Sequence, residues 1–176
     1  MLEAGDGARW EIFVFGSGAP SPWAAEGRAA AAPFFLCYNR ADAALRTQDL
    51  LTAIAWLGGA VRRLEARGAA VVPAIVARAF AGTRIAALDL ELGPEWADPD
   101  PEVPWLAPGH FLPGILRAGG AAGLLAMAAP ADTRVRGTLP SGAERVGALY
   151  RDLGAEPRWL APWGDPTPDA PRRPRD

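Results

Sequence analysis

The chain has 176 residues, the length of one ordinary domain, and half of them are hydrophobic, which is enough to bury a core. Charged residues make up 22% of the chain and the net charge is −2. This balance excludes a basic surface for nucleic acid or for an anionic membrane. Cys37 is the only cysteine, which excludes an intrachain disulfide and a zinc site built on cysteines.

No targeting or membrane segment is predicted. Residues 1–9 are acidic and rich in glycine, whereas a signal peptide has a basic stretch followed by an apolar one. No apolar run reaches the roughly 18 residues that a membrane-spanning helix needs. We therefore expect a cytoplasmic protein with no membrane contact.

Two short apolar runs near the N-terminus predict strands. The first covers residues 10–15, and the second covers residues 33–38 and is apolar on both faces, as interior parallel strands are. A helix is predicted at residues 41–57, because apolar residues recur there near the helical period and Gly58-Gly59 follows. Its apolar stripe consists of Leu45, Leu50, Ile54 and Leu57.

The next segment, residues 61–68, supports two interpretations. Its local pattern predicts a helix that stops at Gly68, whereas its place in an alternating order predicts a strand. We expect residues 61–66 to form an irregular or lost strand, because a central strand would bury Arg63 and Glu65 as unpaired charges. Residues 69–80 are similarly ambiguous, although their apolar residues fit one helix face.

The second half of the chain continues the alternation. Strands are predicted at residues 84–90, 133–139 and 158–161. The apolar residues 111–128 predict one or two helices, broken at Gly119-Gly120. Ser141 and Glu144 form a capping box, which predicts a helix from there to Leu153.

Strands that alternate with helices predict an α/β fold with a parallel, doubly wound sheet of about five to six strands and flanking helices. The proline-rich residues 93–109 predict a long loop inside this domain. We expect one domain over residues 1–163. Residues 164–176 are dominated by proline and arginine and are predicted to be a disordered tail.

Three segments resemble the α/β-hydrolase superfamily, in particular bacterial acetyl xylan esterase-like and dienelactone hydrolase-like proteins. They are residues 38–42 (YNRAD) with 46–53 (RTQDLLTA), residues 77–82 (ARAFAG), and residues 111–120 (FLPGILRAGG) with 124–130 (LLAMAAP). The resemblance implies that residues 34–38 contain the family's fourth strand and residues 61–66 the fifth, with the first two strands missing.

The resemblance also implies where catalytic residues would lie. The family's nucleophile occupies a G-x-S-x-G turn after the fifth strand, and the matching stretch Ala66-Arg67-Gly68-Ala69-Ala70 has Gly68 at that position. No histidine follows His110, so the place of the base is also vacant. At the acid position, no carboxylate occurs before Glu144. We expect no serine-hydrolase activity from the chain alone.

Other chemistry is weakly indicated. Ser17, Asp89 and His110 are the parts of an alternative catalytic set, but Ser17 lacks the turn pattern. The acidic residues in the proline-rich loop match no calcium-binding spacing, so we predict no metal site. The sequence has no phosphate-binding glycine loop with its lysine, and we predict no cofactor.

Residues 34–38 are predicted to form an exposed sheet edge: Phe34, Phe35, Leu36, Cys37 and Tyr38. This run has no charge and no internal proline, so nothing protects it from pairing with another strand. A homo-oligomer or a complex with a partner protein is therefore expected. The predicted function is a non-catalytic α/β-hydrolase-like binding or scaffolding module. The alternative is a carboxylic-ester hydrolase, acetyl xylan esterase-like, possibly completed by a partner chain.

Overall fold

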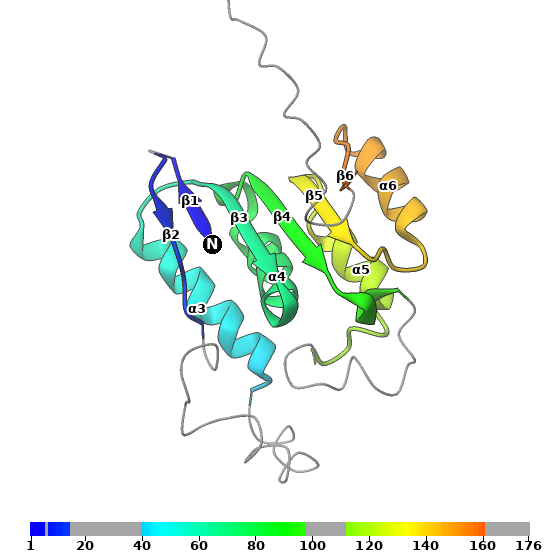
Figure 1. Cartoon of the computed structure of the whole chain (residues 1–176), viewed down its shortest axis with the longest axis horizontal. Coiled ribbons are helices and arrows are strands. Elements are labelled where there is room, and N and C mark those ends of the chain that lie inside the picture. Colours follow the sequence, from blue (N-terminus) through cyan, green and yellow to red (C-terminus); the bar gives the residue numbers. More distant parts are fainter. Residues whose placement is uncertain (6, 15–39, 98–111, 161–176) are drawn as a thin grey trace, which may run out of the picture.

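The computed structural model describes residues 1–5, 7–14, 40–97 and 112–160. Within them, six strands form one mixed sheet in the order β2-β1-β3-β4-β5-β6 (Figure 1). The strands are β1 (Leu2–Ala4), β2 (Arg9–Trp10), β3 (Val61–Arg67), β4 (Ala87–Leu92), β5 (Asp132–Gly137) and β6 (Arg158–Leu160). Strands β3 to β6 are parallel, and β1 is antiparallel to both of its neighbours, β2 and β3.

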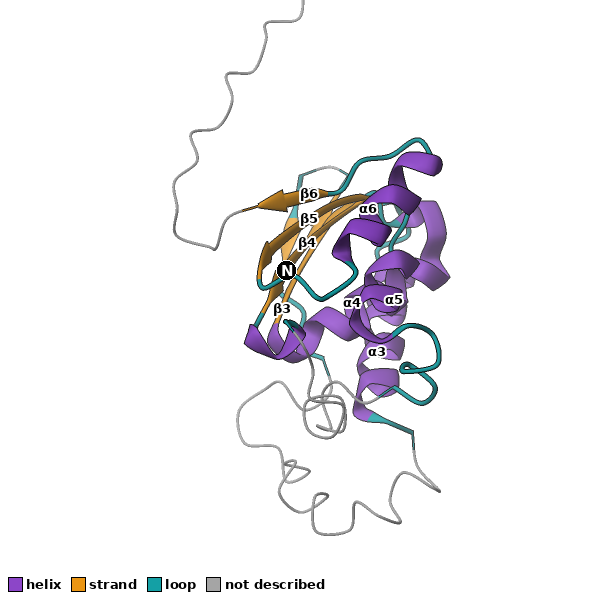
Figure 2. Ribbon diagram, turned by 90° about the vertical axis from the view of Figure 1, so that its right-hand side faces the viewer, coloured by secondary structure: helices purple, strands orange, loops and turns teal. Residues whose placement is uncertain are grey.

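Four α-helices pack on one face of this sheet (Figure 2). They are α3 (Asp42–Trp56), α4 (Val71–Ala81), α5 (Gly120–Met127) and α6 (Ala143–Asp152). Helices α4, α5 and α6 each connect one parallel strand to the next. Because the strand order advances in one direction, successive crossovers of the same hand place their helices on the same side. Three short 3₁₀ turns complete the fold: η1 (Gly68–Ala70), η2 (Gly82–Arg84) and η3 (Pro94–Trp96).

The core lies between the sheet and the helix layer. In β4, the side chains of Leu88, Leu90 and Leu92 are buried on the helix side, while Asp89 and Glu91 lie on the opposite side. This alternation follows from the two-residue period of a strand. From the helix layer, fully buried residues meet these leucines: Val71, Ile75, Leu124 and Leu125.

The predicted α/β class and the strand number are confirmed, with two differences. The sheet is mixed and not wholly parallel, because β1 pairs antiparallel with β3. A doubly wound sheet also needs helices on its second face, and no helix in the described part of the chain lies there. We call this second side of the sheet the open face. No described helix is long and apolar enough to cross a membrane.

Strand β3 corrects the expectation that residues 61–66 are irregular or lost. It is a seven-residue strand in the middle of the sheet, paired with β1 and β4, and its one irregularity is a register shift opposite β1. The expected cost of burying Arg63 and Glu65 does not arise, because both lie on the open face. There Arg63 also donates a hydrogen bond to Asp89 on the neighbouring strand.

Element boundaries differ at several other places. A strand was predicted over residues 10–15, but β2 ends at Trp10 and residues 11–14 are not in a strand. Helix α5 begins only at Gly120, although the apolar segment that predicted it begins at residue 111. The predicted capping by Ser141 is wrong: α6 begins at Ala143 with Gly142 as its N-cap, and no side chain caps it. Residues 69–80 are helical, in η1 and α4, with Pro73 in the first turn.

Several predicted features lie outside the described residues. These are Ser17, His110, the tail over residues 164–176, and the predicted edge formed by Phe34, Phe35, Leu36, Cys37 and Tyr38. The edge, the tail and the alternative catalytic set therefore stay predictions.

Candidate functional site

The open face of the sheet is lined with charged side chains. The alternation that turns leucine and valine toward the helices turns acidic and basic residues toward the other side. On strands β3 to β6 these residues are Arg63, Glu65, Arg67, Asp89, Glu91, Asp132, Arg134, Arg136 and Arg158. A face of this composition is suited to contact with water or with a polar partner, and not to packing against a second apolar layer.

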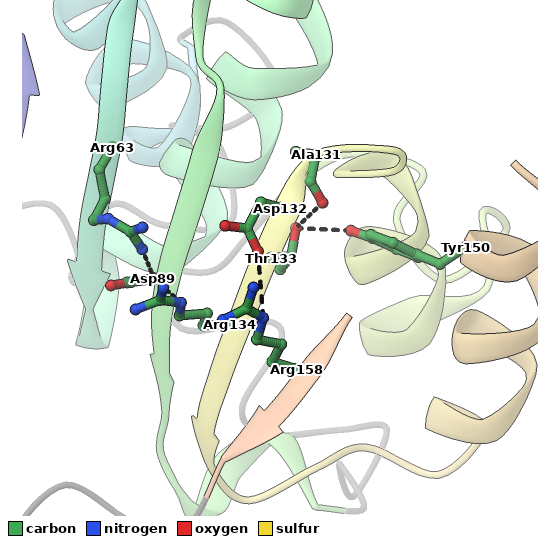
Figure 3. A network of polar contacts seen from close by, with 8 residues as sticks. All are labelled: Arg63, Asp89, Ala131, Asp132, Thr133, Arg134, Tyr150 and Arg158. Carbon is green, nitrogen blue, oxygen red and sulfur yellow. Dashed lines mark hydrogen bonds and ion pairs between the residues drawn. The ribbon is translucent and has the colours of Figure 1, made fainter. Parts of the chain in front are cut away.

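Asp89 is the centre of an ion-pair network on this face (Figure 3). Arg63 donates a hydrogen bond to Asp89 Oδ1 at 2.6 Å, and Arg134 Nε lies 3.9 Å from the same oxygen. The side chains of Arg63 and Asp89 are 18% and 14% exposed, so their pairing is partly shielded from water. One carboxylate thus faces two guanidinium groups from the two neighbouring strands.

A second ion pair lies farther along the sheet. Arg158 Nε on β6 is 3.8 Å from Asp132 Oδ1 on β5. Arg134 Nε is buried without a hydrogen-bond partner, since its distance to Asp89 is too long for a hydrogen bond. Arg134 therefore shares the Asp89 carboxylate with Arg63.

A pocket of about 440 Å³ opens at the carboxyl ends of β3 and β4. Its lining consists of Met1, Glu11, Ile12, Glu65, Ala66, Arg67, Ala70, Asp89 and Glu91. Carboxyl ends of parallel strands are where ligands gather in open α/β sheets. Four carboxylates outnumber two cationic groups in this lining, the Arg67 guanidinium and the Met1 ammonium, which donates a hydrogen bond to the carbonyl oxygen of Glu65. Neither the Glu65 nor the Glu91 side chain forms an ion pair with another described residue.

Gly68 lies beside this pocket, at the turn from β3 into α4. Its φ angle is +53°, in the left-handed region that favours glycine, and an added Cβ would meet no atom within 4 Å. The residue pattern left this segment open between helix and strand, and the strand–turn–helix connection seen here was only implied by the family resemblance. The turn offers space for a side chain next to the pocket but has none. Among the described residues, the lining contains no serine, threonine, cysteine or histidine.

Asp89 is the one member of the alternative catalytic set that the structure describes. The alternative catalytic set required Asp89 to act together with Ser17 and His110, which lie outside the described residues. In the structure Asp89 lies within β4 and is held by Arg63. No group of three or more metal-binding side chains occurs among the residues that the structure describes.

Sequence reasoning missed the main members of the site: Glu11, Glu65, Glu91, Arg134 and Arg158. A signal for two of them, Glu91 and Arg134, was present, because residues 88–92 (LDLEL) and 133–136 (TRVR) alternate between charged and uncharged residues. This pattern predicts a strand with one charged face. It does not predict which strands are neighbours, and the site depends on that.

A separate polar group is buried on the helix side of the sheet. Thr133 donates a hydrogen bond to the carbonyl oxygen of Ala131, so the hydroxyl of Tyr150 is the donor in its 2.9 Å bond to Thr133. Burial raises the pKa of Tyr150. The nearby Arg78 is 7% exposed, and burial lowers its pKa. None of these side chains lines the pocket on the open face.

No protein-family model, curated protein or solved structure matches this chain. The site is therefore interpreted from its own geometry, in which carboxylates line a pocket to which the described part of the chain contributes no nucleophile.

Proposed function

We propose that this chain is a non-catalytic, α/β-hydrolase-like binding or scaffolding module that captures positively charged groups in the pocket on its open face. The observation that carries the proposal is the composition of the pocket lining. Four carboxylates, those of Glu11, Glu65, Asp89 and Glu91, line it together with two cationic groups, the Arg67 guanidinium and the Met1 ammonium. Arg63 already pairs with Asp89, whereas the Glu65 and Glu91 side chains form no ion pair with a described residue. A carboxylate that lacks a cation within its own chain gains most from a cation supplied by a ligand.

The shape of the pocket favours an arginine or lysine side chain as the bound group. Ile12, Ala66 and Ala70 provide apolar surface for the methylene stem of such a side chain, while the carboxylates pair with its charged end. Arginine is the better match, because its planar guanidinium forms two parallel hydrogen bonds with a carboxylate. The partner class is therefore a protein or peptide that presents arginine.

The turn at Gly68 supports the non-catalytic part of the proposal. In the family that the sequence resembles, the nucleophile would stand on the turn that follows the central strand, and here that turn carries no side chain. The order β3-α4-β4-α5-β5-α6-β6, with every helix on one face, is compatible with the fifth to eighth strands of such a domain. Membership of that superfamily is part of the proposal.

The proposal is tested with a short arginine peptide and a matched peptide in which citrulline, which is uncharged, replaces arginine. We expect binding of the arginine peptide at low salt, and at least about tenfold weaker binding of the citrulline peptide. The double variant Glu65→Gln/Glu91→Gln should lose most of this difference, whereas Glu144→Gln on the exposed surface of α6 should keep it. Equal binding of the two peptides would refute the proposal.

Ester hydrolysis is the competing hypothesis, and it is tested separately. A fluorophosphonate probe labels an activated serine covalently. We expect no labelling of the purified chain. Labelling that disappears in Ser17→Ala would show instead that the chain contains a working nucleophile.

A further inference from the structure

Four charged residues of the open face stand in one row across four strands. The strand register pairs Glu65 with Asp89, Asp89 with Arg134, and Arg134 with Arg158. The row therefore contains two negative charges, on β3 and β4, followed by two positive charges, on β5 and β6. Its sign changes at the boundary between β4 and β5.

The neighbouring row repeats this change of sign at the same boundary. Glu91 on β4 pairs in register with Arg136 on β5, two residues farther along both strands. On the open face, β4 carries Ala87 followed by two acidic residues, Asp89 and Glu91. Strand β5 carries Asp132 followed by two arginines, Arg134 and Arg136. We call the β3–β4 side of these rows the acidic half and the β5–β6 side the basic half. Strand β3 also carries Arg63 and, in register with Glu91, Arg67 on the open face.

We infer that a second copy of this chain docks on the open face, related by a two-fold axis that runs parallel to the strands between β4 and β5. Rotation about this axis places β3 opposite the partner's β6 and β4 opposite the partner's β5. Glu65 then faces the partner's Arg158, and Asp89 faces the partner's Arg134. Because the interface is isologous, each of these pairs occurs twice.

The dimensions of packed sheets are compatible with this arrangement. Two sheets stacked face to face lie about 10 Å apart, a gap that the side chains of one glutamate and one arginine span together. Within one chain, Glu65 and Arg158 are separated by three strand spacings, about 14 Å, so they do not pair with each other. Arg158 is 58% exposed and extends from the last described strand, where a partner can reach it.

The symmetry of the charges favours a second copy over an unrelated basic protein. A basic partner would neutralise the acidic half and repel the arginines of the basic half, whereas a second copy satisfies both halves at once. Parallel sheets are also rarely left with one face uncovered. The inference rests on the proposed function, because the arginines of the partner would occupy the same acidic pocket.

The decisive experiment is a charge exchange between Glu65 and Arg158, followed by sedimentation velocity at several protein concentrations and two salt concentrations. We expect concentration-dependent dimers of the natural chain that weaken at high salt. The single variants Glu65→Arg and Arg158→Glu should each weaken the dimer by about tenfold or more, because each creates like-charge contacts across the interface. The double variant should regain the dimer, and a mixture of the two single variants should form one such restored contact in a heterodimer.

Matched controls separate this effect from misfolding and from the proposed function. Arg145→Glu reverses one charge on the exposed surface of α6 and should leave the dimer unchanged. Circular dichroism checks that each variant folds, and Glu65→Gln with Arg158→Gln provides neutral replacements if a reversal does not. A natural chain that stays monomeric at low salt, or a double variant that stays as weak as the singles, overturns the inference. If such a monomer still prefers the arginine peptide to the citrulline peptide, the proposed function stands without the dimer.

Discussion

The two faces of the central sheet use the same strands for different purposes. On β4, Leu88, Leu90 and Leu92 are buried against the helices, and the intervening Asp89 and Glu91 point to the open face. The helix side is mostly apolar; its buried polar residues are the group formed by Thr133, Tyr150 and Arg78, and Asp42 and Thr47 on α3. Residues one position apart therefore differ in their tasks: those on the helix side bury the apolar surface that stabilises the fold, and those on the open face are the ones to which our proposal assigns selectivity for a partner.

The largest expected effect comes from a core residue on the helix side. Leu90 is 2% exposed, and Leu90→Ala leaves a cavity, which should lower the free energy of unfolding by about 2–5 kcal/mol. The adjacent Glu91→Ala on the open face should change it by less than about 0.5 kcal/mol. Urea denaturation of both variants measures the difference. Similar losses in the two variants would show that the open face is also part of the stabilising core.

A smaller effect is expected at the centre of the charged network. Asp89→Ala leaves the partly shielded guanidiniums of Arg63 and Arg134 facing each other without an anion. We expect a loss of roughly 1–3 kcal/mol, between the values for exposed and for fully buried ion pairs. Adding Arg63→Leu to this variant should recover part of the loss, because it removes one of the uncompensated charges. A double variant less stable than Asp89→Ala would contradict this electrostatic explanation.

An intermediate loss of stability is expected at Gly68, in the turn that connects β3 to α4. Gly68→Ala places a side chain at a positive φ angle, which costs about 1–2 kcal/mol, although the space around it is open. Gly59→Ala, at a glycine with no positive φ angle, is the control and should cost less. Thermal unfolding of both variants tests this expectation. Equal melting temperatures for Gly68→Ala and the natural chain would show that the turn is not strained by a side chain.

The smallest effect is expected at the polar group on the helix side. Tyr150→Phe removes a hydrogen bond to Thr133 and should cost roughly 0.5–1.5 kcal/mol at neutral pH. Burial raises the pKa of Tyr150, so the folded chain holds this proton more tightly than the unfolded chain does. The stability that the neutral hydroxyl supplies is present below the ordinary tyrosine pKa and is lost as the pH rises above it. Stability curves that fall equally in both proteins at alkaline pH would contradict this assignment.

Sequence reasoning succeeded where a local pattern determined the structure. The apolar period of residues 41–57 predicted α3, and the alternation around Asp89 predicted β4. Strand β1 was not predicted, because its three residues carry no strand pattern of their own and are extended only through pairing with β2 and β3. The prediction of strand β3 was uncertain because a central strand covered on both faces would bury the charged side chains of Arg63 and Glu65. This objection disappears once one face of the sheet is known to be open.

The candidate site was only partly predictable for a related reason. Gly68 was identified from the sequence because it stands at the nucleophile position of the family motif. Asp89 was identified because it lies near the end of a predicted strand. Glu65, Arg134 and Arg158 come together through strand register, and register depends on contacts between distant segments. A charged face is visible in the alternation of single strands. The division of that face into two halves of opposite charge appears only when the strands are ordered.

The position of β1 has a consequence for how the chain folds. Strands β3 to β6 follow one another along the chain, and their pairings join residues 24 to 45 positions apart. The pairing of Met1 with Glu65 joins residues 64 positions apart, and closing such a long loop costs more entropy. The segment with β1 and β2 should therefore join the sheet after the other strands and open before them. Native-state hydrogen exchange would then show faster exchange at Leu2–Ala4 than at Ala87–Leu92.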